Sequence, residues 1–406
     1  MTFAHAPSRR EVLAGTGALF AWAHMPLLAH AEGRDPRFLT IILRGALDGL
    51  ATVAPAGDPD WTALRGDNAL RFDGKVAPLQ LDNFFALNPA MPNLHRLFQA
   101  NEAIIVHACA TPYRERSHFD GQDLLESGLP QPTPSDSGWL NRALHGLASG
   151  GRVDPAGSAK ALGIGPALPL VVRGAAPVLT WSPQSAPPAS EDTARRLLDL
   201  YHHADLKLAH VMEENAKLAA MEPIDAMRGP LGNRPRVYFA EAAAMAAEFL
   251  AQPNGPRVGA LALDGWDTHN NEGIAGGRLA QLLGSLDGAI ASVRANMGPA
   301  WRETVVVVIT EFGRTAHING TEGTDHGTAT VALLAGGALK GGRVIADWPG
   351  LKPSDLYENR DLKPTTDLRA VLKGVLKDHL RVDERALAET VFPGSKNVKA
   401  LPGLVG

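Results

Sequence analysis

The chain has 406 residues, of which 45% are hydrophobic, and it carries a formal net charge of −4 and a single cysteine, Cys109. This hydrophobic fraction is enough for a large folded core, and the slightly acidic balance provides no basic surface for nucleic acid. One cysteine excludes a disulfide within the chain and a structural zinc site built from paired CxxC motifs.

The first 31 residues have the composition of an export signal. Arg9 and Arg10 precede a stretch of small and apolar residues at positions 14–28, and Ala29-His30-Ala31 fits a cleavage site. Paired arginines in this position are typical of twin-arginine export in bacteria. We therefore expect residues 1–31 to be a signal read by the twin-arginine translocase, giving a periplasmic or secreted protein with no membrane span. The alternative is an ordinary N-terminal helix.

Apolar stretches of strand length alternate with helical stretches along the rest of the chain. Strands are expected at residues 38–43, 103–108, 257–263, 303–310 and 331–334, and helices at residues 93–99, 118–126, 138–147, 277–297 and 366–379. Strands that alternate with helices predict an α/β fold with a doubly wound, mostly parallel sheet and helices on both of its faces.

The middle of the chain departs from this alternation. Residues 162–172 are apolar and rich in Gly and Pro, which we interpret as a pair of strands, and residues 174–189 have the composition of a loop. Residues 191–221 and 236–252 are rich in Ala, Leu and Glu, as helices are. We therefore expect one α/β domain over residues 32–406, with a helical cap inserted at about 174–255.

Polar side chains follow the predicted strands at the points where the strands end. They are Asp48 after the first strand, Arg114, Arg116, Ser117, His118 and Asp120 after the second, Asp267 and His269 after the third, and Glu311, Arg314, Asp325 and His326 after the fourth. Ligands of open α/β sheets bind at the carboxyl ends of the strands, so these side chains are expected to lie together. Carboxylates and imidazoles are ligands of Zn²⁺ and Mn²⁺, and a cation would remove the repulsion between the carboxylates.

Several of these residues also have a simpler interpretation. Ser117 stands where a helix should begin, so it is either a nucleophile beside an anion site or an N-cap, with Asp120 completing a box-like turn. Asp48 followed by Gly49 is also typical of a turn, and His326 alone could be a hydrogen-bonded structural histidine. His107, inside an apolar run, is expected to be a core histidine.

The motifs taken together resemble a known family. The twin-arginine leader is combined with RGALDGL, YRERSHFDGQ, SGWLNRAL, GWDTHNNEG, and VITEFGRT followed by GTDHGTATVALLAGG. This combination resembles the exported bacterial proteins called "domain of unknown function 1501" over nearly the whole chain. That family is similar to the sulfatases and to the alkaline phosphatase superfamily. The resemblance implies a doubly wound α/β sheet, two divalent metals, and a Ser, Thr or formylglycine nucleophile at a helix start.

The resemblance also implies roles for single residues. It matches Asp48 to the first metal aspartate, Ser117 to the nucleophile, Asp267 and His269 to the Asp and His of one metal, Glu311 to a second metal carboxylate, and His326 to a late metal histidine. Two departures stand out. Glu311-Phe312 replaces an Asp-His pair, for which His118 could substitute, and neither Cys109 nor Ser117 has the spacing of a formylglycine sulfatase.

The sequence therefore predicts an exported metal-dependent hydrolase of a small anionic ester, a phosphate or a sulfate. The expected cofactor is one or two ions of Zn, Mn or Ca, with Ser117 as nucleophile and as a further candidate ligand, and with Arg114, Arg116 or Arg314 binding the anionic group. The alternative is a non-catalytic, metal-stabilised binding protein of the cell envelope whose cap binds a partner or a polysaccharide. Isomerase or transferase chemistry at the same site is a third possibility, and the substrate and oligomeric state stay open.

Overall fold

A computed structural model describes residues 34–149, 161–182, 235–253 and 255–406, together with a few single residues between 198 and 213. The predicted signal at 1–31 and the predicted helix at 191–221, apart from those single residues, lie outside the described residues. In the described part of the chain, every helix is too short or too polar to cross a membrane.

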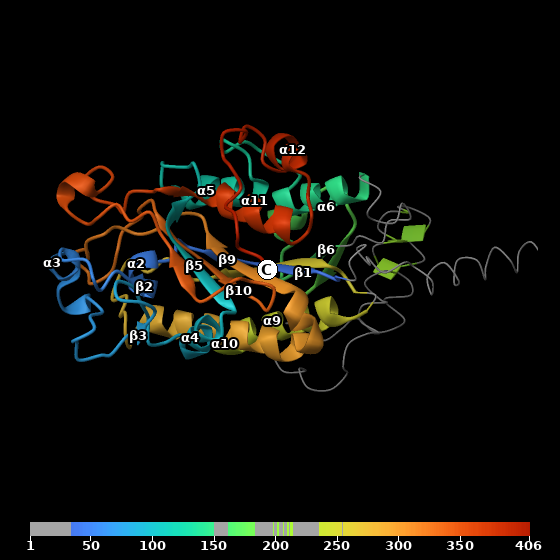
Figure 1. Cartoon of the computed structure of the whole chain (residues 1–406). Coiled ribbons are helices and arrows are strands. Elements are labelled where there is room, and N and C mark those ends of the chain that lie inside the picture. The colour runs from blue at the N-terminus through green and yellow to red at the C-terminus, as the bar shows by residue number, and fades with distance from the viewer. Residues whose placement is uncertain are drawn as a thin grey trace, which may run out of the picture.

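A nine-stranded sheet forms the centre of the molecule (Figure 1). Its path runs β11-β5-β10-β9-β1-β8-β6-β7, and β12 pairs with β5. All pairs are parallel except those of β10, which is antiparallel to both β5 and β9. The strands are β1 Arg37–Arg44, β5 Ala103–Ala110, β6 Ala161–Ile164, β7 Val178–Trp181, β8 Val258–Asp264, β9 Thr304–Thr310, β10 Thr330–Ala335, β11 Arg343–Ile345 and β12 Thr366–Asp367.

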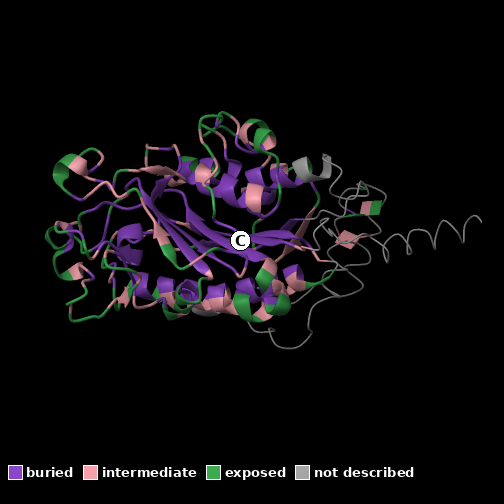
Figure 2. Ribbon diagram, viewed as in Figure 1, coloured by how far each residue is buried: buried purple, intermediate pink, exposed green. Residues whose placement is uncertain are grey.

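Helices cover both faces of this sheet. One face carries α5 His118–Ser127, α6 Trp139–Ser149 and α11 Leu368–Asp378, and the other carries α4 Pro92–Gln99, α9 Pro235–Ala251 and α10 Arg278–Met297. Successive side chains of β1 enter different cores: Leu39 and Ile41 join the cluster under α4, α9 and α10, whereas Phe38 and Ile42 join the cluster under α6 and α11. A strand buried on both faces is expected to be apolar throughout, and Figure 2 shows the sheet buried between its helices. The predicted fold class is confirmed.

Shorter elements surround the carboxyl end of β1. The helices α2 Gly49–Thr52 and α3 Trp61–Arg65 lie there, with a small antiparallel sheet of β2 Val53–Ala54, β4 Ala86–Leu87 and β3 Leu79–Gln80. The remaining elements are α12 Glu384–Ala386, a π-helical turn at Leu387–Val391, and 3₁₀ turns at Gly66–Asn68, Leu170–Val172, Gly298–Glu303 and Pro353–Asp355.

Two expectations for the middle of the chain are wrong. The predicted strand pair at residues 162–172 is one strand, β6, followed by a 3₁₀ turn, and the neighbour of β6 is β7, inside the stretch predicted as a loop. Because β6 and β7 are parallel, they need a crossover between them and cannot form a hairpin. β7 belongs to the central sheet and α9 packs against α10, so these parts of the proposed cap at 174–255 belong to the main body.

The topology brings five chain segments to one edge of the sheet. β1, β5, β8 and β9 are aligned in one direction through their shared neighbours, so their carboxyl ends share an edge. β10 runs the other way, so its first residue lies at that same edge. The ends of these five strands therefore meet there, with the loops that follow β1, β5 and β8 and the one loop that joins β9 to β10.

We expect His107 on β5 to make the stability of the fold depend on pH. Its ring is fully buried, accepts from the amide of Ala108 and lies 2.9 Å from the carbonyl of Val53, and burial lowers its pKa to about 4. Between pH 6.5 and pH 4, His107 is protonated in the unfolded chain but stays neutral in the folded chain. The free energy of unfolding should therefore fall by roughly 3 kcal/mol as the pH drops through this window.

The measurement is urea denaturation at several pH values, with His107→Gln as the comparison because its amide can still donate to Val53. The difference in unfolding free energy between the two proteins should change across this window. An identical pH profile for both proteins would contradict the assignment.

Candidate metal centre

The site residues come from three loops at this edge. His118 is the first residue of α5, after the N-cap Ser117, and Asp267 and His269 follow β8. Arg314 and His326 lie on the segment that joins β9 to β10. That segment folds back on itself, because Arg314 and His326 form an antiparallel bridge and Gly313 donates to the carbonyl of Thr328.

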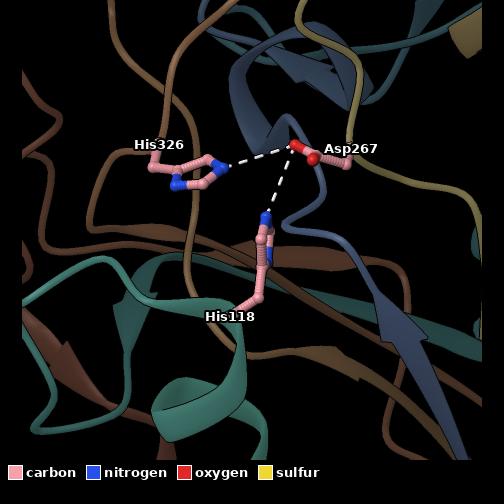
Figure 3. Close-up of side chains that lie close together, drawn as sticks. All are labelled: His118, Asp267 and His326. Carbon is pink, nitrogen blue, oxygen red and sulfur yellow. Dashed lines mark hydrogen bonds and ion pairs between the residues drawn. The ribbon is translucent and has the colours of Figure 1, made fainter.

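Three side chains converge at the centre of the site, as Figure 3 shows. His118, Asp267 and His326 each present one ligand atom, and these atoms lie within 4.8 Å of one another. Nε2 of His118 and Nε2 of His326 are each 3.4 Å from Oδ1 of Asp267. This spacing is suited to a small cation shared by two imidazoles and one carboxylate.

A buried carboxylate sets the proton position on His118. Nδ1 of His118 lies 2.8 Å from Oε1 of Glu311, which also accepts from the amide of Gly45 at 2.8 Å and from Gln122. Burial would raise the pKa of Glu311, but these hydrogen bonds, led by that of His118, lower it overall. Glu311 is therefore ionised and accepts from Nδ1, so Nε2 carries the free lone pair that faces Asp267. Nε2 of His118 is buried and has no hydrogen-bond partner.

The bond to Glu311 is also the largest influence on the pKa of His118, which it raises against the opposing effect of burial. This carboxylate–imidazole arrangement is typical behind metal-binding histidines, because it orients the ring and makes the ligand nitrogen more basic.

A backbone carbonyl has the same role for His326. Nδ1 of His326 lies 2.9 Å from the carbonyl oxygen of Arg116, which can only accept, so Nδ1 is the donor and Nε2 has the lone pair. Burial lowers the pKa of His326, and the nearby charges of His118 and Arg314 lower it further. The ring of His326 is therefore neutral, and its Nε2 faces the centre of the site. The carbonyl that orients this ring belongs to Arg116, whose φ of 61° is unusual for a residue with a side chain.

His269 provides a fourth donor atom. Its Nε2 is 3.0 Å from Oδ1 of Asp267 and 3.0 Å from Nε2 of His326, and its Nδ1 is 3.4 Å from Asp325. Since Nε2 of His326 has no proton to donate, the two imidazole nitrogens can be satisfied together either by one proton or by a cation between them. Three imidazoles and one carboxylate are a donor set typical of zinc.

Arg314 lies against the same carboxylate. Its side chain is fully buried, with Nη1 2.9 Å from Oδ1 of Asp267 and Nε 3.2 Å from the hydroxyl of Thr324. Burial raises the pKa of Asp267, but the charge and hydrogen bond of Arg314 outweigh it, and the pKa is lowered. Nη2 of Arg314 is buried and has no hydrogen-bond partner, so one donor is left for a further acceptor.

Two predicted metal ligands are engaged elsewhere. Both oxygens of Asp48 are bound by Arg65, at 2.6 and 3.1 Å, and Oδ1 also caps α2 through the amide of Ala51. Both Asp48 and Arg65 are buried, so the guanidinium supplies the positive charge that a metal was expected to supply. Glu311 lies behind His118 instead of beside a second ion. Within the described part of the chain, the structure therefore groups ligands for one ion and forms no second site from Asp48 and Glu311.

Two of the three predicted anion-binding arginines are also engaged. Arg114 folds back on the carbonyls of Thr111 and Tyr113, and Arg116 pairs with the buried Asp361 and with Glu358. These bonds engage Nη1 of Arg114 and both Nε and Nη2 of Arg116. Only Arg314 of the three lies against the cluster.

Ser117 occupies the N-cap position, with φ −90° and ψ 126°, but its side chain makes no capping hydrogen bond. The box-like turn with Asp120 is therefore not formed, and Asp120 instead accepts from the hydroxyl of Tyr113. The neighbours of Ser117 on both sides contact the cluster: Arg116 through its carbonyl and His118 through its ring.

Two buried residues beside the site, Arg65 and Glu272, were missed by the sequence analysis. Arg65 lies on the short helix α3 and reaches Asp48 only because α2 and α3 fold together at the end of β1. Glu272 is 1% exposed, and burial, followed by repulsion from Asp48, raises its pKa to about 7. Arg65 stands in none of the motifs, and Glu272 is part of GWDTHNNEG but was not singled out there, so the three-dimensional arrangement identifies the position of both beside the site.

The family model described as "Protein of unknown function (DUF1501)" matches residues 101–391. The chain belongs to this family. The resemblance inferred from the sequence motifs is thereby confirmed. No curated protein matches the sequence.

Solved structures of other proteins are similar to the chain, among them the following three. One is Ps i-CgsB in complex with k-i-k-neocarrahexaose, with 11% identity, 90% of this chain and 77% of that chain covered, and a TM-score of 0.43. The second is a protein in the alkaline phosphatase superfamily from Vibrio parahaemolyticus, with 13% identity, coverage of 80% and 65%, and a TM-score of 0.37. The third is a phosphonate monoester hydrolase of Agrobacterium radiobacter, with 14% identity, coverage of 76% and 70%, and a TM-score of 0.32. Because these TM-scores are low, the fold is assigned from the strand order and register of the chain itself.

We expect Glu311→Gln to lower the pKa of His118. The substitution removes the carboxylate whose hydrogen bond is the largest cause of the raised pKa, so the imidazolium loses its main stabilising partner. The measurement is an NMR titration of the His118 ring in metal-free protein.

Glu126→Gln is the matched control, because Glu126 is a buried carboxylate of the same helix that pairs with Arg44 and not with His118. A pKa of His118 that stays at the wild-type value in Glu311→Gln, in a folded protein, would contradict the assignment.

Proposed function

We propose that this protein is an exported metal-dependent hydrolase of phosphate or sulfate esters that binds one divalent cation between His118, Asp267 and His326. The observation that carries the proposal is the convergence of their ligand atoms within 4.8 Å, with the proton of each imidazole fixed on the far nitrogen by Glu311 or by the carbonyl of Arg116. Within this set, Nε2 of His118 is buried and has no hydrogen-bond partner, so its lone pair is open to a cation.

The donor set narrows the choice of ion. Three imidazole nitrogens, including that of His269, and one carboxylate suit zinc, or manganese as the alternative. Calcium binds six to eight oxygen ligands and is a poor match for a site rich in imidazole. A bound divalent cation would supply Lewis-acid polarisation of an ester oxygen.

The proposal that the substrate is anionic rests on Arg314. Its Nη1 is bound to Asp267, so the guanidinium is held beside the cation ligands, and its Nη2 is a buried donor without a partner. A guanidinium donor with no internal acceptor is suited to an oxygen of a phosphate or sulfate group. We assign Arg314 the role of binding that group.

Ser117 is the proposed nucleophile. It lies at the start of the ten-residue helix α5, whose first amides have no acceptor within the helix and favour a nearby anion. In the proposed reaction, Oγ of Ser117 bonds to phosphorus or sulfur, the ester oxygen leaves as the alcohol with the hydroxyl proton, and water then releases the anion and restores Ser117. His118 is fixed by Glu311 and is therefore assigned to the cation and not to proton transfer.

Export and partners are also part of the proposal. The paired arginines and the Ala29-His30-Ala31 sequence support export through the twin-arginine translocase, and hence a periplasmic or secreted location. A small anionic ester, free or carried on an envelope polysaccharide, is the proposed substrate.

A second function is favoured by one observation. The pairing of Asp48 with Arg65 removes a carboxylate from the site, which is the change expected in a non-catalytic, metal-stabilised binding protein of the envelope. Such a protein would bind the metal and the anion but would not turn over any ester. Metal content and turnover therefore separate the two functions.

We expect the exported protein to contain about one zinc or manganese ion per chain, since the structure groups one set of ligands. Asp267→Asn and His326→Ala should each lose most of the ion, as measured by elemental analysis after gel filtration. His317→Ala is the matched control, because His317 is an exposed histidine of the same loop as His326. A metal-free wild-type protein, or equal metal in all variants, would contradict the metal site.

We expect Ser117→Ala to reduce turnover of a phosphate or sulfate ester at least about 100-fold, because loss of a nucleophile removes a covalent route. The metal content should stay unchanged. The measurement is a screen of aryl phosphate monoesters, diesters and sulfates, followed by kcat and KM on the best substrate. Full activity in Ser117→Ala would exclude it as nucleophile, and metal binding without turnover of any ester would favour the binding protein.

We expect Arg314→Lys to raise KM about tenfold or more on that substrate and to weaken inhibition by inorganic phosphate or sulfate. Lysine has a single nitrogen, so it cannot bind Asp267 with one nitrogen and the anion with another. A change confined to kcat, with inhibition by these ions unaltered, would contradict the assignment of Arg314 to the anionic group.

A further inference from the structure

Glu272 is a buried carboxylate outside the cluster of cation ligands. Its Oε1 accepts from the hydroxyl of Thr268 at 2.7 Å, and its Oε2 accepts from the hydroxyl of Thr324 at 3.1 Å. The side chain is 1% exposed and is held by hydroxyls, while Arg65 and Arg314 lie near enough to affect it through their charge. Burying a carboxylate costs free energy, so Glu272 is expected to have a specific role.

The two threonines belong to different ligand-bearing loops. Thr268 stands between Asp267 and His269, and Thr324 stands two residues before His326. The same two residues are joined by the main chain, since the amide of Thr324 is 3.3 Å from the carbonyl of Thr268. Glu272 therefore contacts both loops from the buried side.

The main chain fixes Glu272 itself. Its amide donates to the carbonyl of Glu322 at 2.9 Å, and its carbonyl accepts from the amide of Leu279, in the first turn of α10, at 2.8 Å. The main chain of Glu272 is thus bonded to the first turn of α10, a helix that packs on the sheet. Glu272 lies in the same loop as Thr268, and its amide is bonded to the loop of Thr324, so its main chain and its side chain both join the two loops.

The direction of the hydroxyl proton links Glu272 to Arg314. A threonine hydroxyl has one proton, and in Thr324 that proton is donated to Glu272, so the oxygen offers only lone pairs to its other neighbour. That neighbour is Nε of Arg314, 3.2 Å away. Because the guanidinium is planar, fixing Nε on Thr324 and Nη1 on Asp267 also fixes the direction of Nη2.

We propose that Glu272 is a positioning residue that fixes the loop of Asp267 and His269 relative to the loop of Arg314 and His326, through Thr268 and Thr324. The inference deepens the proposed function and rests on its metal site. Glu272 touches neither the cation ligands nor the substrate group. Burial, followed by repulsion from Asp48, raises the pKa of Glu272 to about 7.

The test compares metal-free and zinc-bound forms of the full-length protein. Glu272→Leu removes both acceptors, Glu272→Gln retains one oxygen acceptor, and Thr268→Val and Thr324→Val each remove one hydroxyl with little change of shape. Asp287→Leu is the matched control. Asp287 is also a buried carboxylate, and it accepts from the amides of Asn93 and Leu94, so it joins α10 to α4 and touches neither ligand loop.

In Glu272→Leu we expect zinc affinity, measured by competition with a chelator, to fall about tenfold or more, the range known for residues that orient metal ligands. Amide exchange at residues 267–269 and 324–326 of the metal-free protein should become at least about tenfold faster. Each valine variant should produce a smaller effect, with non-additive coupling to Glu272→Leu because they share one network. Glu272→Gln should restore part of the loss, and Asp287→Leu should leave both readouts at these loops unchanged.

The proposal is overturned if a folded Glu272→Leu keeps wild-type zinc affinity and wild-type exchange in both loops. If Glu272→Leu does not fold, the two valine variants decide by the same readouts, and wild-type values in both overturn the proposal. If wild-type protein binds no zinc, the metal site of the proposed function fails, and exchange in the metal-free variants alone decides the role of Glu272.

Discussion

The hydrogen bond between Glu311 and His118 is the interaction on which the arrangement of the site depends. It joins the end of β9 to the start of α5, and the amide of Gly45, after β1, binds the same carboxylate oxygen. Gly45 has a φ of +120°, and a side chain there would come within 2.5 Å of the amide of Asp267. The ends of β9 and β1, the start of α5 and the Asp267 loop are thereby packed around one ionised group, and the ring of His118 is left with one nitrogen that has no hydrogen-bond partner.

The pairing of charges explains why fewer carboxylates face the metal site than the sequence predicted. Several carboxylates gather at this edge, and three of them have a partner of their own: Asp48 has Arg65, Asp361 has Arg116, and Glu311 has His118 and amides. A buried carboxylate that lacks such a partner would have a raised pKa and lose its charge. Asp267 is the carboxylate left facing the imidazoles, and even it shares an oxygen with Arg314.

The sequence was sufficient to predict the sheet and the edge at which the residues gather. Long apolar runs such as residues 303–310 predict buried strands, and parallel strands place their ends together, so His118, Asp267, His269 and His326 could be grouped in advance. Pairings between side chains could not be predicted, because they depend on distances that only the packed helices set. Arg65 is the example: 17 positions separate it from Asp48, and no periodicity connects them. The parallel pairing of β6 with β7 was missed for a related reason: the Gly and Pro residues between the two strands mark turns but do not show whether the strands pair in parallel or as a hairpin.

The reversed direction of β10 has a mechanical consequence for the site. Because β10 returns directly beside β9, Arg314 and His326 sit on two arms of one ribbon that is closed by main-chain bonds at Gly313 and Gly327. Asp267 lies opposite, on the turn after β8, and the main chain of this turn is bonded to the ribbon: the amides of Asn271 and Glu272 donate to Thr321 and Glu322, and that of Thr324 donates to Thr268. The ribbon and the turn are therefore one connected scaffold. A change in the position of Asp267 would be transmitted directly to Arg314 and His326.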